Sequence, residues 1–225
     1  MNKANIKQNP FHINRQYFDS LQTADRAKNE IAAGLDLLNR IDKRIVTFFG
    51  SHKTQPGSPM YEHCKTVACQ LGKQGYAIIT GGGTGIMRAA NSGAMEAGTD
   101  SIGFKAALLR DEQVTEPIYT AQISFELLFV RRFTMTIKSE AIIIYPGGYG
   151  TDNELLELEM LMQTGIIDKA LIVCVNTAHW DGLFEWLGKD QKAQNFLING
   201  KKDLELVRFA DSPQEVIQLV SSQLF

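Results

Sequence analysis

A glycine-rich turn between an apolar run and a helical pattern is the feature that most restricts how this chain can fold. The β-branched run at residues 141–145 leads directly into Pro146, and a helix is predicted over residues 152–163. A strand followed at once by a helix is the repeating unit of α/β proteins. Glycines let backbone N–H groups approach an anion, and a helix N-terminus favours negative charge. The sequence therefore predicts a phosphate site in this turn, formed by Gly147, Gly148, Tyr149, Gly150 and Thr151.

Glu154 follows this turn and places a carboxylate beside the predicted phosphate site. A loop that only bound phosphate would gain nothing but repulsion from such a charge. The mismatch indicates chemistry next to the phosphate. An acidic residue near a helix start also complements the helix dipole, and this simpler interpretation stays open.

The rest of the chain alternates between short apolar runs and longer helical patterns, which is typical of α/β proteins. We expect one α/β domain over residues 13–225, with a doubly wound, mostly parallel sheet and helices on both faces, preceded by a flexible arm at residues 1–12. An amphipathic helix over residues 17–40 leads the domain. The predicted strands and further helices are 44–49, 58–74, 76–80, 86–97, 101–104, 125–138, 170–175, 180–188 and 212–222, and residues 106–123 are expected to be irregular. Helix caps are expected at Ser58, which precedes a proline, at Ser212 with Glu215 as a capping box, and at Gly98.

A second glycine loop follows the predicted strand 76–80 and consists of Gly81, Gly82, Gly83, Thr84 and Gly85. In a doubly wound sheet the turns after the strands lie at one edge, so both glycine loops can border one crevice. Their spacing fits neither the dinucleotide-binding fingerprint nor the P-loop. A tight turn that serves only close packing is the alternative for this loop.

Arg131 and Arg132 lie in the predicted helix 125–138, where their neighbours are apolar. Adjacent helical residues point about 100° apart, so at most one of these arginines can face a given ligand squarely. A guanidinium in apolar surroundings usually has an anionic partner, such as a carboxylate or a phosphate. An arginine that bridges subunits or caps a helix would give the same pattern.

Charge and composition give no indication of a macromolecular partner. A net charge of −2 and a pI of about 6.1 provide no general attraction to nucleic acid or to an anionic membrane. No stretch has the length and apolarity of a signal peptide or a membrane span. The three cysteines and four histidines show no metal-binding spacing. We therefore expect a cytoplasmic protein with a small-molecule ligand, no metal and no cofactor.

Three motifs together resemble the LOG (Lonely Guy) family of cytokinin riboside 5′-monophosphate phosphoribohydrolases, whose members were often labelled lysine decarboxylases. The family motif P-G-G-x-G-T-x-x-E is complete from Pro146 to Glu154, the glycine loop at residues 81–85 continues into Ile86-Met87, and an arginine pair precedes the strand 141–145. The resemblance spans residues 45 to about 220. It implies a Rossmann-like fold, a homodimer or larger homo-oligomer, and hydrolysis of nucleoside 5′-monophosphates to free base and ribose 5-phosphate.

The resemblance also implies roles for single residues. Arg131 and Glu154 occupy the catalytic positions, and Arg132 stands where the family usually has a lysine. A carboxylate near C1′ of the ribose would stabilise the transition state, because positive charge develops there as the N-glycosidic bond breaks. Met135 is placed to pack on the base, although a methionine at helical spacing is more often core. Supporting roles are expected for Ser51, Arg132 and Glu157.

Two other classes of function remain open at this point. A non-catalytic carrier of a nucleotide or of molybdenum cofactor would keep both glycine loops without needing a reactive carboxylate. A decarboxylase would need pyridoxal phosphate on a lysine, for which Lys105 and Lys138 are the nearest candidates. A colourless pure protein would count against the decarboxylase.

Overall fold

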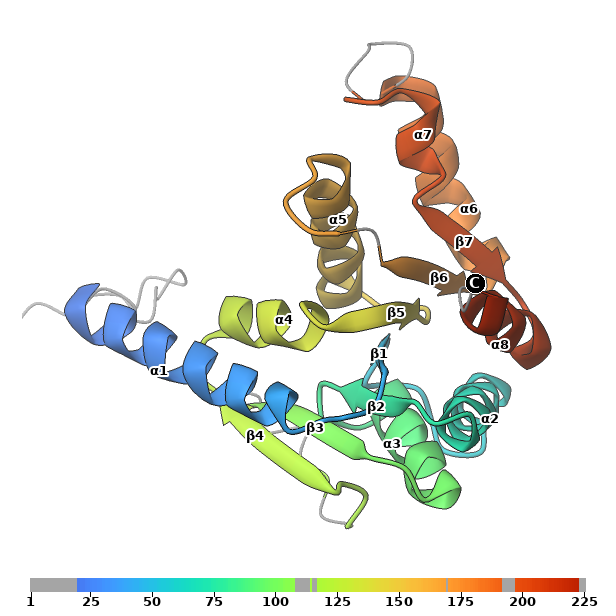
Figure 1. Ribbon diagram of the computed structural model, residues 1–225. Coiled ribbons are helices and arrows are strands. Elements are labelled where there is room, and N and C mark those ends of the chain that lie inside the picture. The colour runs from blue at the N-terminus through green and yellow to red at the C-terminus, as the bar shows by residue number, and fades with distance from the viewer. Residues whose placement is uncertain (1–19, 108–113, 115–116, 169, 192–196, 223–225) are drawn as a thin grey trace, which may run out of the picture.

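A computed structural model describes residues 20–107, 114, 117–168, 170–191 and 197–222, so the arm expected at residues 1–12 lies outside the described residues. A seven-stranded sheet forms the centre of the domain, in the order β4-β3-β2-β1-β5-β6-β7, and every neighbouring pair is parallel (Figure 1). The strands are β1 (Ile45–Phe49), β2 (Ala77–Thr80), β3 (Ser101–Ala106), β4 (Ala121–Phe125), β5 (Ser139–Ile144), β6 (Leu171–Val175) and β7 (Val207–Ala210). The predicted α/β doubly wound fold is confirmed.

Helices cover both faces of the sheet (Figure 1). The elements are α1 (Ser20–Asn39), α2 (Pro59–Lys73), α3 (Ile86–Ala97), α4 (Leu128–Thr136), α5 (Tyr149–Gln163), α6 (Thr177–Trp186), the π-helix η3 (Leu187–Gln191), α7 (Lys201–Leu204) and α8 (Pro213–Ser221). One buried cluster joins α2, α3 and α8 to the sheet. A second joins α1, α4, α5 and α6 to the opposite face. Two separate cores on one sheet are what a doubly wound fold requires.

The strand order reverses between β1 and β5. From β1 the chain builds β2, β3 and β4 outward on one side, and then returns to place β5, β6 and β7 on the other. In open α/β sheets, ligands bind beyond the carboxyl ends of the strands at such a reversal. The loops after β1 and β5 are therefore the two that flank the expected crevice.

Several helix ends form as the sequence predicts. The hydroxyl of Ser58 accepts a hydrogen bond from the backbone N–H of Tyr61 and caps α2, with proline at the first helical position. Ser212 and Glu215 make the expected capping box at α8. Gly98 ends α3 with φ +68°, a conformation in which glycine has no steric penalty.

Two strands and a short helix were absent from the sequence-based prediction. Strand β4 begins inside the segment 106–123 that was expected to be irregular, ends at Phe125, where a helix was expected to start, and pairs with β3; β7 and α7 were not predicted at all. Both strands lie at the edges of the sheet and are only five and four residues long, so each carries a weak periodic signal in the sequence. In the described part of the chain, no helix combines the length and apolarity needed to cross a bilayer.

Candidate active site

A cavity of about 360 Å³ lies at the carboxyl edge of the sheet, where β1 and β5 are neighbours. Three segments and the side of α4 enclose it. Its lining residues are Phe49, Gly50, Ser51, His52, Lys53, Gly81, Met87, Leu128, Arg131, Arg132, Gly148, Tyr149, Gly150, Thr151 and Glu154. The cavity thus brings together both residues expected to be catalytic, the turn after β5 and one glycine of the turn after β2.

Glu154 lies further into α5 than the sequence indicated. The helix begins at Tyr149, with Gly148 as its N-cap, so Glu154 is in the second turn and Asp152 is the acidic residue of the first. The attraction between a carboxylate and the helix dipole falls off beyond the first turn. The half-buried Glu154 carboxylate on the cavity wall is therefore poorly explained as a dipole partner.

The glycines of the turn after β5 differ in what surrounds them. A Cβ at Gly147 would overlap the side chain of Thr151, which is itself buried. A Cβ at Gly148 or Gly150 would meet nothing within 4 Å. Gly147 is thus required by packing, whereas the space beside Gly148 and Gly150 is open toward the cavity. Tyr149 is 94% exposed at the cavity rim.

Arg131 is buried, and its guanidinium is held by the backbone of the neighbouring strands. Its Nε donates to the carbonyl oxygen of Phe104 at 2.6 Å, and its Nη2 donates to that of Gly81 at 3.0 Å. Only 8% of the residue is exposed, on the cavity side. A charged group fixed by two carbonyl acceptors is oriented before any ligand arrives, which is the kind of preorganisation that catalysis uses.

Most residues of the glycine loop after β2 pack behind the cavity and do not line it. Gly81 lines the cavity, whereas Gly82 packs on Gly103 and its carbonyl accepts from the Tyr119 hydroxyl at 2.9 Å. Gly85 has φ +63°, and a Cβ there would overlap the backbone of Ser51. Together with the fully buried Gly83, these contacts favour the packing interpretation that the sequence left open for this loop.

The loop after β1 was not predicted as part of the site beyond Ser51, yet it joins the two glycine loops. The Ser51 N–H donates to the carbonyl of Pro146 at 3.1 Å, and the Ser51 carbonyl accepts from the Ile86 N–H at 3.0 Å. The Thr84 hydroxyl donates to the His52 carbonyl at 2.9 Å. His52 and Lys53 also line the cavity. Only the strand order, which the local sequence does not reveal, places this loop at the site.

The remaining predicted site residues fall into two places. Arg132 lines the cavity and its Nε donates to the Glu157 carboxylate at 2.7 Å, so these two residues join α4 to α5. Met135 is 1% exposed within the core under α4, which fits the core alternative rather than contact with a base.

A polar contact supports the turn from behind. The Tyr145 hydroxyl, directly before Pro146, lies 2.9 Å from Nδ1 of His63 on α2. Burial raises the pKa of Tyr145 well above its usual range and lowers the pKa of His63. Both groups are thus held neutral near pH 7, which suits a structural contact. Among the described residues, no group of three or more His, Cys, Asp or Glu side chains is placed to hold a metal ion.

Comparison with known proteins agrees with the motifs. A family model described as "Possible lysine decarboxylase" matches residues 87–220. A cytokinin riboside 5′-monophosphate phosphoribohydrolase from Arabidopsis thaliana is 31% identical over 64% of this chain and 62% of the relative. Another from Mycobacterium marinum is 28% identical over 64% of this chain and 77% of the relative. The chain thus spans less than two thirds of the Arabidopsis relative.

Solved structures show the same fold at low identity. The molybdenum cofactor binding protein from Rippkaea orientalis has a TM-score of 0.58 and 20% identity, over 82% of this chain and 99% of that chain. The molybdenum cofactor carrier protein from Chlamydomonas reinhardtii has a TM-score of 0.56 and 21% identity, over 81% and 98%. The arginine and glutamate motifs lie within the residues that the family model matches. The chain therefore belongs to the family described as possible lysine decarboxylase, which is the LOG family.

Proposed function

We propose that this protein hydrolyses the N-glycosidic bond of nucleoside 5′-monophosphates, AMP or an N6-modified AMP, to free base and ribose 5-phosphate. The observation that supports this most strongly is the shared cavity, in which Glu154 and Arg131 face the open space beside Gly148 and Gly150. One wall of that cavity suits a phosphate and another carries a carboxylate, and a nucleotide presents a phosphate and an anomeric carbon a few bonds apart.

The chemistry follows from charge development at C1′. As the bond to the base breaks, the ribose gains oxocarbenium character, and a fixed carboxylate stabilises this charge more in the transition state than in the ground state. Glu154 fills this role and also orients the attacking water, in analogy to carboxylates that cleave O-glycosides. No metal or cofactor enters the proposed reaction.

The other cavity residues position the nucleotide. The N–H groups at the start of α5, with Thr151, bind the 5′-phosphate. Arg131 contributes charge-assisted hydrogen bonds from a guanidinium already oriented by Phe104 and Gly81. Holding the sugar at a fixed distance from Glu154 removes much of the entropic part of the barrier.

A panel of nucleoside monophosphates incubated with pure protein and scored for free base tests this proposal. Glu154→Gln is expected to lower base release from AMP by at least about a hundredfold while AMP still binds. Glu159→Gln, the same substitution on another side of α5, is the matched control and should keep normal turnover. Normal turnover by Glu154→Gln would contradict the assignment.

The alternatives predict different outcomes in the same assay. A carrier, like the molybdenum cofactor carrier protein from Chlamydomonas reinhardtii, would bind AMP or cofactor tightly and form no ribose 5-phosphate. For a decarboxylase, the two lysines named above are poorly placed, because the Lys105 ammonium lies over the Tyr119 ring and the Lys138 ammonium contacts Asn39. Neither lines the cavity of about 360 Å³ that Arg131 and Glu154 share, although Lys138 lines the adjoining hollow.

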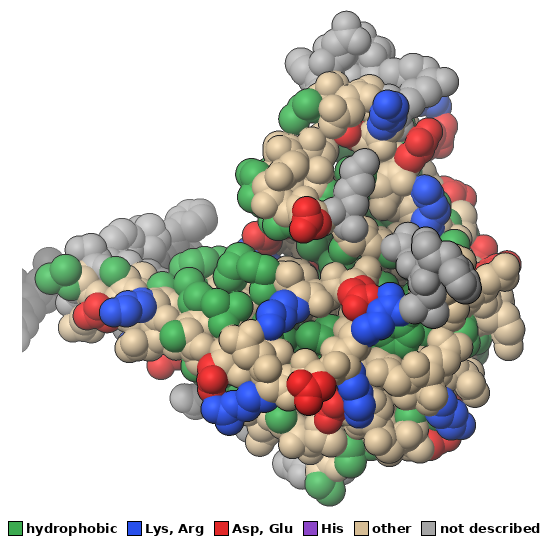
Figure 2. Space-filling view, in the orientation of Figure 1, with side chains coloured by type: hydrophobic (Ala, Val, Ile, Leu, Met, Phe, Trp, Pro, Cys, Tyr) green, Lys and Arg blue, Asp and Glu red, His purple; other side chains and the backbone are tan. Residues whose placement is uncertain are grey.

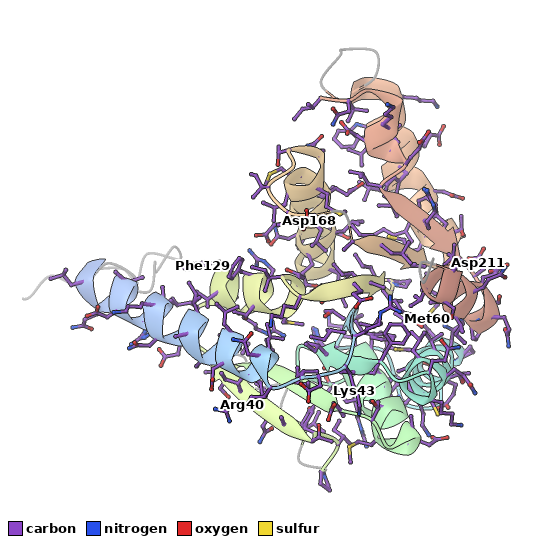
Figure 3. All side chains as sticks on the ribbon, viewed as in Figure 1. Arg40, Lys43, Met60, Phe129, Asp168 and Asp211 are labelled. Atoms are coloured by element: carbon purple, nitrogen blue, oxygen red, sulfur yellow. The ribbon has the colours of Figure 1, made fainter. Side chains whose placement is uncertain are left out.

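A second copy of the chain is the proposed partner, bound at the notch between α4 and α5. This hollow of about 610 Å³ adjoins the cavity through Glu154 and Arg132. Apolar side chains gather along α4 beside it (Figure 2), and Phe129 and Asp168 lie on its two sides (Figure 3). The exposed apolar residues that line it are Phe133, Ile137 and Ile166. In a two-fold dimer the same patch meets itself, so one apolar surface is enough.

A further inference from the structure

The loop after β1 contributes residues to the cavity, and the proposed function gives them no role. Because the strand order reverses between β1 and β5, the loops after these two strands face each other across the crevice. The loop after β5 supplies backbone N–H groups to one side of the cavity. The loop after β1 supplies Ser51, His52 and Lys53 to the other.

The backbone of this loop is engaged in structure, whereas its side chains are not buried by it. Ser51 uses both its N–H and its carbonyl to join the neighbouring loops, and the His52 carbonyl accepts from Thr84. The Lys53 N–H donates to the Ser51 hydroxyl at 3.1 Å. His52 and Lys53 are exposed residues that line the cavity. They are thus carried by a fixed backbone to the mouth of the site.

The charges around the cavity indicate a role for Lys53 in binding an anion. Arg131 donates to two backbone carbonyls, and Arg132 donates to Glu157 across the notch. Both guanidinium groups therefore have structural bonds to maintain. Glu154 adds a negative charge that repels a phosphate dianion. A further cation near the α5 N-terminus would offset that repulsion, and Lys53 is an exposed ammonium on the same cavity.

We propose that Lys53, assisted by His52, binds the 5′-phosphate of the substrate from the side opposite the α5 N-terminus, and that this contact makes the site select nucleoside monophosphates over nucleosides. The inference rests on the proposed function and specifies which residues read the phosphate. An ammonium group offers three donors without a fixed plane, which suits the rotating oxygens of a phosphate monoester.

Steady-state kinetics of Lys53→Ala test this binding role. The variant is expected to raise KM for AMP about tenfold, the effect of losing one hydrogen bond to a charged group, with kcat close to wild type. KM for adenosine should not change, because adenosine lacks the phosphate. Lys53→Arg should restore most of the affinity for AMP. His52→Ala should raise KM for AMP by a smaller factor than Lys53→Ala.

A matched control separates this contact from a general loss of charge. Lys73→Ala removes the same charge from the exposed far end of α2 and should leave KM for AMP unchanged. In wild type, KM for AMP should rise with salt, because salt screens exposed charges, and the rise should be smaller in Lys53→Ala. Thermal unfolding of each variant checks that the fold is kept.

Calorimetric measurement of AMP and inorganic phosphate binding distinguishes a failure of the proposed hydrolase activity from a failure of the phosphate-binding role of Lys53. If wild type releases base but Lys53→Ala leaves both KM and the Kd for AMP unchanged, the phosphate assignment is overturned and the hydrolase stands. If wild type releases no base from any nucleotide while Lys53→Ala still weakens AMP and phosphate binding, the hydrolase fails and the phosphate assignment stands.

Discussion

The guanidinium of Arg131 donates from Nη2 to the carbonyl oxygen of Gly81 at 3.0 Å, so the residue expected to act in catalysis is held by the first glycine of the loop after β2. The loop after β2 thus holds Arg131 in place, even though most of the loop does not line the cavity. The glycine is needed because any side chain at position 81 would occupy the space that the guanidinium fills.

Gly81→Ala is expected to displace Arg131. The added Cβ would overlap Nη2, the far end of a flexible side chain, so the protein should fold with a modest loss of stability. A displacement of about 1 Å at a catalytic group can lower the rate by about a hundredfold. Base release from AMP measured beside thermal unfolding checks this, with Gly182→Ala, whose Cβ would meet no atom within 4 Å and whose φ is not positive, as the control for an added methyl group. Full activity in Gly81→Ala would contradict a catalytic role for the Arg131 position.

Gly148→Ala should act on binding alone. Its backbone has φ −112°, which alanine adopts freely, and a Cβ there would meet nothing in the protein. Only a ligand that approaches the backbone closely would meet the new methyl group. We expect unchanged unfolding and a KM for AMP raised about tenfold or more, as for the loss of a hydrogen bond to a charged group. An unchanged KM would show that the phosphate does not lie against this glycine.

Glu159 should make stability depend on pH. Burial, with the neighbouring Asp203 carboxylate as the smaller cause, raises the pKa of Glu159 from 4.5 to about 7. The folded state therefore keeps a proton that the unfolded state loses, and stability falls as pH rises from 4.5 to 7. Glu159→Gln should remove this fall and be more stable than wild type at about pH 8, by about 1–3 kcal/mol. Urea unfolding at several pH values measures it, and parallel profiles for the two proteins would refute the assignment.

Phe133→Glu should prevent association at the notch. Phe133 is 41% exposed on α4 and lines the hollow, so a charge there would be buried by a second copy. Light scattering after size exclusion should show a dimer for wild type and a monomer for the variant. Leu21→Glu, at an exposed position on α1, is the matched control and should remain a dimer. A monomeric wild type would rule out the proposed partner.

The parts of the fold that the sequence predicted are those encoded locally. The unit from β5 through Gly147 and Gly148 into α5 was predicted because apolar run, glycine turn and helical pattern follow one another in the chain. The caps at Ser58 and Ser212 were predicted for the same reason. Local signals of this kind depend on a few neighbouring residues, so they can be recognised in the sequence without knowledge of the tertiary structure.

The parts that were missed depend on residues far apart in the chain. Edge strands β4 and β7 have one partner strand each and are only five and four residues long, so the sequence around them gives a weak strand signal. His52 and Lys53 carry no motif that marks them as site residues. They reach the cavity because β1 pairs with β5, and this pairing joins segments about ninety residues apart.

Ser51 bonds through its N–H to one glycine turn and through its carbonyl to the start of α3. The floor of the cavity is therefore a single cooperative unit, in which no loop can open to solvent without breaking a bond to another. Amide hydrogens of all three loops should exchange with water at similar rates, and a ligand that tightens one loop should slow exchange in the other two. Evolution can vary the exposed side chains on this floor more easily than it can reshape any one of its loops.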